Sequence, residues 1–133
     1  MIQSMNTPSS SSDCVQVYGI PNCDTVKKAR TWLTAQGIAY EFHDFKKQGV
    51  PPAALDHWLR TLGWETVLNR KGTTWRKLDA ALQAQVQDAA SAKAVMLAHA
   101  SVIKRPVVEW HGSQGENSVS VGFNAIDWAK QRL

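Results

Sequence analysis

The sequence predicts an α/β protein with a mixed four-stranded sheet, and three observations support this prediction. Near the N-terminus, two strand patterns flank an amphipathic helix and so form a βαβ unit. A series of helical patterns then occupies the middle of the chain. Two more strand patterns and a final helix follow, which gives the order βαβ, helices, ββα.

The chain of 133 residues suits a single domain with a hydrophobic core. We expect residues 14–133 to form this domain and the Ser-rich residues 1–13 to be a disordered tail. The tail lacks the charged and apolar segments of an export signal, and no apolar run approaches the roughly 20 residues of a membrane span. We therefore expect a cytoplasmic protein without a membrane partner, in which Cys23 is a free thiol.

The net charge is +4, and basic residues occur in neighbouring pairs such as Arg70-Lys71 and Lys104-Arg105. Because no long basic tract is present, this pattern favours a compact anionic ligand over nucleic acid. We expect the six tryptophans to pack in the core rather than to stack on bases. The four histidines and two cysteines have no zinc-binding spacing, so no metal site is predicted.

The βαβ unit is expected to begin near the N-terminus. Its strand, helix and second strand cover about residues 15–18, 24–36 and 40–45. The helix places Val26, Ala29 and Leu33 on one face and stops at Gly37. A right-handed crossover makes the two strands parallel neighbours.

The middle of the chain is predicted to be helical. Pro51-Pro52 opens a helix whose apolar residues recur at helical spacing, and Gly63 ends it. These apolar residues are Leu55, Trp58, Leu59 and Leu62. A polar loop over 69–74 follows, and then two helices over about 82–88 and 91–98.

The last quarter of the chain returns to strand patterns. We predict strands over 106–110 and 118–121, joined by a turn over 111–117 that is rich in turn-forming residues. A final helix over about 125–132 is expected to pack through Ile126, Ala129 and Leu133. This order of elements is that of a thioredoxin-like fold with a helical insertion.

Cys23 is the strongest candidate for a chemically active residue. It follows the first strand and a tight turn, and it opens the first helix. At this position the unpaired helical N–H groups and the helix dipole favour the reactive thiolate over the thiol. Lys27 lies one turn further on and adds positive charge. The alternative is a buried structural cysteine.

Pro106 is the second candidate, because thioredoxin-like folds place a cis-proline opposite the cysteine at the start of the third strand. The segment Lys104-Arg105-Pro106-Val107-Val108 supplies a proline at that point. Proline is tolerated at the first residue of a strand, and cis bonds occur mostly before proline. We therefore predict a cis bond, the alternative being an ordinary trans proline.

Three blocks of sequence resemble one family. They are YGIPNCDTVKKA from Tyr18, LNRKGTTWRKL from Leu68 and IKRPV from Ile103. In this order they are similar to the arsenate reductase (ArsC)/Spx family and, more narrowly, to its YffB-like branch. The resemblance covers about residues 15–132 and implies a thioredoxin-like fold with an active Cys23.

In the arsenate reductases of this family, the cysteine attacks arsenate, glutathione forms a mixed disulfide, and glutaredoxin resolves it. Arginines bind the oxyanion, and Arg70 and Arg105 match two of them by motif. A guanidinium suits this role because its planar donors bind oxyanions in pairs. Further candidates for binding glutathione or substrate are Pro106, Asn22, Lys27, Lys71 and Lys104.

The chain departs from the family pattern at several points. No arginine is present near Gly122, where the third family arginine is expected, and Gly19 stands where a histidine often precedes the cysteine. Val26 occupies the second position of the Cys-x-x-Cys pair found in Spx, so this motif holds one thiol. Cys14 starts the strand that Cys23 follows, too far away for a bridge, and we expect no catalytic role for it.

Two functional interpretations remain open at this point. The first is a glutathione-dependent thiol reductase similar to arsenate reductase, with monothiol chemistry at Cys23 and an anionic ligand held by Arg70 and Arg105. It needs no bound cofactor, and glutathione is its cosubstrate, with glutaredoxin as a further partner. The alternative is a non-enzymatic, Spx-like binding module that contacts RNA polymerase.

Overall fold

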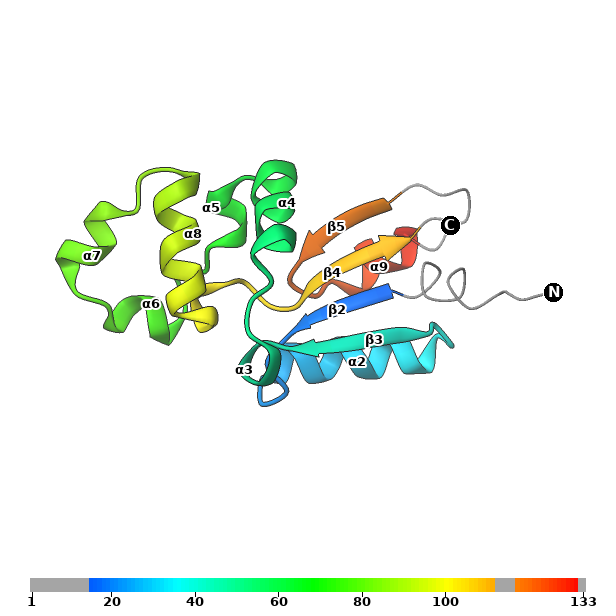
Figure 1. The fold of residues 1–133 in the computed structure, drawn as a ribbon. Coiled ribbons are helices and arrows are strands. Elements are labelled where there is room, and N and C mark those ends of the chain that lie inside the picture. The colour runs from blue at the N-terminus through cyan, green and yellow to red at the C-terminus, as the bar shows by residue number, and fades with distance from the viewer. Residues whose placement is uncertain (1–14, 112–116, 132–133) are drawn as a thin grey trace.

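The computed structural model describes residues 15–111 and 117–131, which form a four-stranded sheet with helices on both faces (Figure 1). The strands are β2 (Val15–Gly19), β3 (Tyr40–Asp44), β4 (Val107–His111) and β5 (Asn117–Val121), in the order β3-β2-β4-β5. β2 pairs in parallel with β3, while β4 is antiparallel to both β2 and β5. The predicted mixed sheet and thioredoxin-like order are confirmed.

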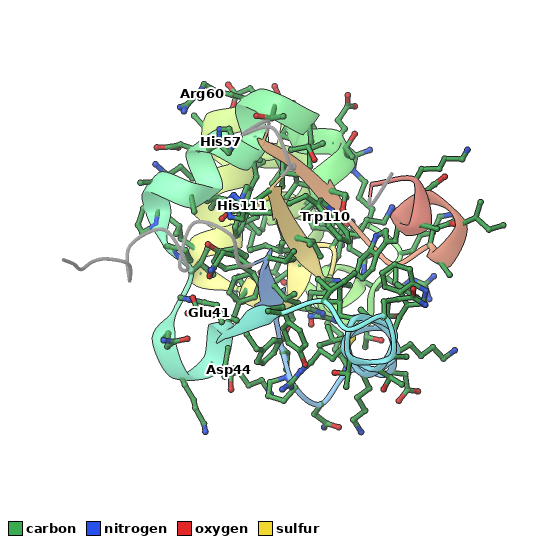
Figure 2. All side chains as sticks on the ribbon, turned by 90° about the vertical axis from the view of Figure 1, so that its right-hand side faces the viewer. Glu41, Asp44, His57, Arg60, Trp110 and His111 are labelled. Carbon is green, nitrogen blue, oxygen red and sulfur yellow. The ribbon has the colours of Figure 1, made fainter. Side chains whose placement is uncertain are left out.

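Helices α2 (Asp24–Ala35) and α9 (Ala125–Gln131) cover one face of the sheet, and α4 (Pro52–Leu62) covers the other (Figures 1 and 2). As predicted, α2 buries Val26, Ala29 and Leu33. α4 begins with a proline at its first position and ends before Gly63, which has φ +85°.

The helical insertion extends from one end of the sheet (Figure 1). Its remaining elements are α3 (Phe45–Gln48), α5 (Trp64–Val67), α6 (Thr73–Lys77), α7 (Ala80–Gln85), α8 (Ala89–Ala98) and the 3-10 turn η1 (Ala100–Val102). Leu68 and Ile103 form an isolated antiparallel bridge that closes the insertion where the chain returns to β4.

The hydrophobic core consists of two clusters, one on each face of the sheet. The cluster under α4 and α8 includes Trp58, Met96 and Val107, and the cluster under α2 and α9 includes Leu33, Trp110 and Trp128. The other three tryptophans, Trp32, Trp64 and Trp75, are partly buried against these clusters. The predicted role of the tryptophans in packing is therefore confirmed.

A half-buried carboxylate joins the sheet to α4. Glu109 on β4 accepts one hydrogen bond from the Tyr18 hydroxyl and one from the Trp58 indole N–H, each 2.9 Å long. Burial, together with the charge and hydrogen bond of Glu109, raises the pKa of Tyr18 well above its ordinary value. Tyr18 is therefore a neutral hydrogen-bond donor, and the three side chains tie two strands to the insertion.

Several predicted boundaries differ from those of the structure. The side chain of Asp44 accepts a hydrogen bond from the Lys46 N–H and so ends β3 before Phe45, which belongs to α3. The predicted loop over 69–74 is shorter, because α6 begins at Thr73. The helix predicted over 82–88 is shifted to α7, since Asp88 forms a capping box with Ser91 and starts α8 instead.

The predicted packing of the last helix is wrong. Ile126 is 72% exposed and Ala129 is also exposed, while Trp128 is the buried residue of α9. Trp128 meets Trp32, Trp110 and Phe123 edge-to-face at 4.8–5.6 Å between ring centroids. One large aromatic side chain thus attaches this short helix to the sheet.

Some predictions lie outside the described residues. These are the disordered tail over 1–13, the role of Cys14, the turn residues 112–116 and the packing of Leu133. Within residues 15–111 and 117–131, none of the helices has the length and apolar character that crossing a bilayer requires.

Candidate functional site

The topology brings the predicted site residues to one edge of the sheet. β2 and β4 are antiparallel neighbours with Tyr18 opposite Val107, so the carboxyl end of β2 and the amino end of β4 lie together. The turn that carries Cys23 leaves β2 at this edge, and the segment that carries Arg105 and Pro106 enters β4 there. The helical insertion lies at the same end of the sheet (Figure 1).

Cys23 is a half-buried free thiol at the N-cap position of α2. Its backbone is extended, with φ −146° and ψ 123°, and its carbonyl accepts the first helical hydrogen bond from the Lys27 N–H at 2.9 Å. The Cys23 side chain makes no capping hydrogen bond, so its sulfur is not committed to the helix. The predicted strand, turn and helix-start geometry is confirmed.

Charges of both signs surround this helix start. Lys27 and Lys28 are exposed and, within the described part of the chain, form no ion pair. Asp24 occupies the first turn of α2 directly after the cysteine. Its carboxylate offsets part of the positive potential that the helix dipole and the lysines supply.

Arg105 and Pro106 form a second part of the edge. The bond between them is cis, as predicted, and the Pro106 carbonyl accepts a hydrogen bond from the Gly122 N–H at 2.9 Å. Arg105 is half-buried, and one of its terminal N–H groups donates to the Ser101 carbonyl at 3.1 Å. Its Nε is buried and has no hydrogen-bond partner among the described residues.

Arg70 lies on an exposed turn of the insertion. Hydrogen bonds from the Asn69 N–H to the Val102 carbonyl and from the Lys104 N–H to the Val67 carbonyl hold this turn beside the segment that enters β4. The Arg70 side chain is 51% exposed, lies 4.0 Å from the Glu65 carboxylate and stacks over the ring of Trp64 at 5.2 Å. Arg70 is thus held loosely compared with Arg105.

Arg70, Lys71 and Lys104 line one cavity of about 240 Å³, together with Glu65, Leu68 and Asn69. The first three are sequence-predicted binding residues, and the structure brings them together from two chain segments. Three cations and one carboxylate give the cavity a positive balance. This arrangement suits a compact anion such as a carboxylate or oxyanion.

Lys104 also lines a second cavity of about 310 Å³ with Gly122, Phe123, Asn124 and Asp127. This is the place where the family's third arginine is expected and where the chain has Gly122. A lysine therefore supplies positive charge here, but an ammonium lacks the paired, planar donors of a guanidinium.

Sequence reasoning missed a third cavity, of about 560 Å³, on the outer side of α2. Its lining residues are Lys27, Lys28, Thr31, Trp32, Ala35, Phe123 and Ala125. Of the predicted site residues only Lys27 belongs to it, while Asn22 is exposed in the turn before Cys23. No local pattern marks this cavity, because Trp32 and Phe123 meet only through the fold.

The four-stranded sheet, the single motif cysteine at the start of α2 and the cis-proline before β4 place the protein in the thioredoxin-like class. The particular family follows from comparison with known sequences. The model of the ArsC family matches residues 18–131, and the chain belongs to this family, in its YffB-like branch.

Individual relatives agree with this assignment. A structure named YffB protein is 47% identical with a TM-score of 0.81, covering 90% of this chain and 99% of its own. An arsenate reductase (ArsC) related protein from Brucella melitensis is also 47% identical, with a TM-score of 0.65 and 90% and 96% coverage. An uncharacterized protein of Haemophilus influenzae is 36% identical over 86% of this chain and 95% of its own.

Proposed function

We propose that the protein is a glutathione-dependent thiol reductase that uses Cys23 as its only motif thiol. The observation that carries this proposal is an uncommitted, half-buried thiol at the start of α2, at the edge that also holds Arg105 and the cationic cavity. Membership of the ArsC family supports thiol chemistry at this position.

The reaction needs no second protein thiol. The Cys23 thiolate attacks the glutathione sulfur of a mixed disulfide between glutathione and a substrate thiol, and the substrate leaves as a thiolate that takes up a proton. A second glutathione thiolate then attacks the Cys23–glutathione disulfide. This step releases oxidised glutathione and restores the Cys23 thiolate, and glutaredoxin is a further candidate for it.

Val26 supports this monothiol scheme. It occupies the second position of a Cys-x-x-Cys pair and is fully buried against the sheet, so the motif has no resolving thiol. An external thiol must therefore complete the cycle. Glutathione suits this role because its two carboxylates match Arg105 and the cavity lined by Arg70, Lys71 and Lys104.

Arsenate is a weaker substrate under this proposal. A small oxyanion needs several paired donors around the sulfur, and this chain has Gly122 in place of one arginine and Gly19 in place of a histidine. Lys104 supplies the positive charge of the missing arginine but lacks the planar donors of a guanidinium. We expect mixed-disulfide reduction to be measurable and arsenate reduction to be weak or absent.

The test is incubation with oxidised glutathione followed by intact-mass analysis. We expect one glutathione adduct on the wild-type protein and none at this position in Cys23→Ser. A turnover panel of arsenate, hydroxyethyl disulfide and glutathione mixed disulfides then ranks the substrates. Fast arsenate turnover would contradict the substrate argument, and an unmodified Cys23 would favour the Spx-like binding module that contacts RNA polymerase.

A further inference from the structure

The cavity on the outer side of α2 is named here the aromatic groove. Among its lining residues, we call Trp32 and Phe123 the walls, the small residues Thr31, Ala35 and Ala125 the floor, and Lys27 and Lys28 the rim. A volume of about 560 Å³ lies in the range typical of small-molecule sites, which are mostly apolar with a few polar groups. Trp32 and Phe123 are both only partly buried, so their rings are accessible.

The groove begins one helical turn after Cys23. Lys27 is four residues after Cys23 on the same helix, which places it about 6 Å further along the helix axis. The Lys27 N–H is hydrogen-bonded to the Cys23 carbonyl, so the start of the groove is fixed relative to the cysteine. A group bonded to the sulfur that reacts with Cys23 can therefore extend into the groove.

The charges at the rim determine which group fits. Lys27 and Lys28 are exposed, and neither forms an ion pair with any described residue. Asp24 lies one turn before Lys28 and is not within 4.0 Å of it. An apolar floor with two free ammonium groups complements a flat ring that carries a negative charge.

We propose that the aromatic groove binds the substrate thiol of the mixed disulfide. The preferred substrate is an aromatic thiol that carries a carboxylate or sulfonate. The proposal rests on the function proposed above. In the first step this thiol departs when its disulfide bond to glutathione breaks, while glutathione becomes bonded to Cys23. Glutathione itself is assigned to Arg105 and to the cavity lined by Arg70, Lys71 and Lys104.

Binding is tested without thiol chemistry, by titrating the Cys23→Ser protein with the aromatic sulfonate 1-anilinonaphthalene-8-sulfonate. In NMR spectra, we expect the backbone amide chemical shifts to change only in α2 and at residues 123–125. Thr31 is an exposed lining residue in the middle of α2, so Thr31→Glu and Thr31→Gln add similar bulk without loss of packing. The added carboxylate should weaken binding about fivefold more than the amide.

Two further variants examine the wall and the rim. Phe123→Ala should weaken binding about tenfold through lost apolar contact, and Lys28→Gln about threefold. Leu97→Ala removes an exposed apolar side chain of α8, and Lys77→Gln an exposed charge of α6, so neither should change the affinity. Equal affinity of the Thr31→Glu and Thr31→Gln proteins, or shifts outside the groove, would overturn the proposal.

Substrate preference is tested with two glutathione mixed disulfides, one of 5-thio-2-nitrobenzoate and one of 2-mercaptoethanol. The wild-type enzyme should have the higher kcat/KM for the aromatic anion, and Thr31→Glu should remove most of that preference while leaving the aliphatic substrate unaffected. An equal preference in both proteins would contradict the inference. If neither disulfide is reduced, the proposed function fails, whereas the titration still decides whether the groove binds aromatic anions.

Discussion

The sheet edge holds Arg105 half-buried beside Pro106, whereas the helical insertion presents Arg70 on an exposed turn. One terminal N–H group of Arg105 is hydrogen-bonded to the Ser101 carbonyl, and its Nε is excluded from solvent. Arg70 has only a 4.0 Å approach to Glu65 and a stacking contact with Trp64. The two arginines match the family motif equally well, but the fold gives them different environments.

Because of this difference, Arg105 is fixed in position more firmly than Arg70. The residues at the sheet edge are held by strand pairing and by a backbone hydrogen bond from the Gly122 N–H to the Pro106 carbonyl. The residues of the insertion are held by a turn whose side chains remain largely in water. A charge-assisted contact is stronger where water is excluded, so the sheet edge should supply most of the binding free energy.

Arg105→Ala should have the largest effect on ligand binding. Loss of a half-buried, charge-assisted contact costs about 1.5–3 kcal/mol, so we expect glutathione affinity to fall by about ten- to hundredfold. Calorimetric titration of the Cys23→Ser background with oxidised glutathione measures this change. Arg105→Lys restores the charge without the planar donors and should recover only part of the loss. Unchanged affinity in Arg105→Ala would place the anion elsewhere.

Glu109→Gln tests the contact between the two regions rather than the ligand. The amide oxygen can still accept from the Trp58 N–H, but the NH2 group faces the Tyr18 hydroxyl, which must then accept a hydrogen bond instead of donating one, and both contacts lose the charged acceptor. We expect a loss of about 1–3 kcal/mol in the free energy of unfolding, measured by urea denaturation. Glu41→Gln, on the exposed part of β3, is the matched control and should change stability little. Equal stability of both variants would contradict a structural role for Glu109.

Arg70→Ala should weaken glutathione binding much less than Arg105→Ala. An exposed ionic contact contributes under about 1 kcal/mol, so the expected change is less than about fivefold and should shrink in high salt. The same titration at two salt concentrations measures it. An effect of Arg70→Ala as large as that of Arg105→Ala would mean that the insertion closes over the ligand and removes Arg70 from water.

The sheet and its site edge were largely predictable from the sequence because their signals are local. Alternation of Val15 and Val17 with polar residues marks a strand, and the turn before Cys23 ends at a helix start. The cis bond before Pro106 was predicted from the thioredoxin-like order of elements, which places a cis-proline at this strand start, and it is confirmed. The strand and the helix start depend on residues that are neighbours in the chain, and the cis bond depends on the order of those local elements.

Other features depend on tertiary contacts and had no local signal. The four-residue helices α3 and α5 are too short for a helical period to appear. Ile126 fits a helical period but is exposed, because α9 buries Trp128 against the sheet instead. Lys104 lines two cavities, because the Leu68–Ile103 bridge places it beside the Arg70 turn and the Gly122–Pro106 hydrogen bond holds the end of β5 beside the segment that carries it.

Asp24→Asn gives the smallest expected effect and tests the sheet edge alone. The Asp24 carboxylate lies in the first turn of α2, directly after Cys23, and offsets part of the positive potential of the helix start. Removing it should increase the rate of Cys23 alkylation by iodoacetamide at neutral pH about two- to threefold. Asp79→Asn, at the start of α7 in the insertion, is the control and should leave the rate unchanged. If both variants react like the wild-type protein, the Asp24 carboxylate has no influence on the reactivity of Cys23.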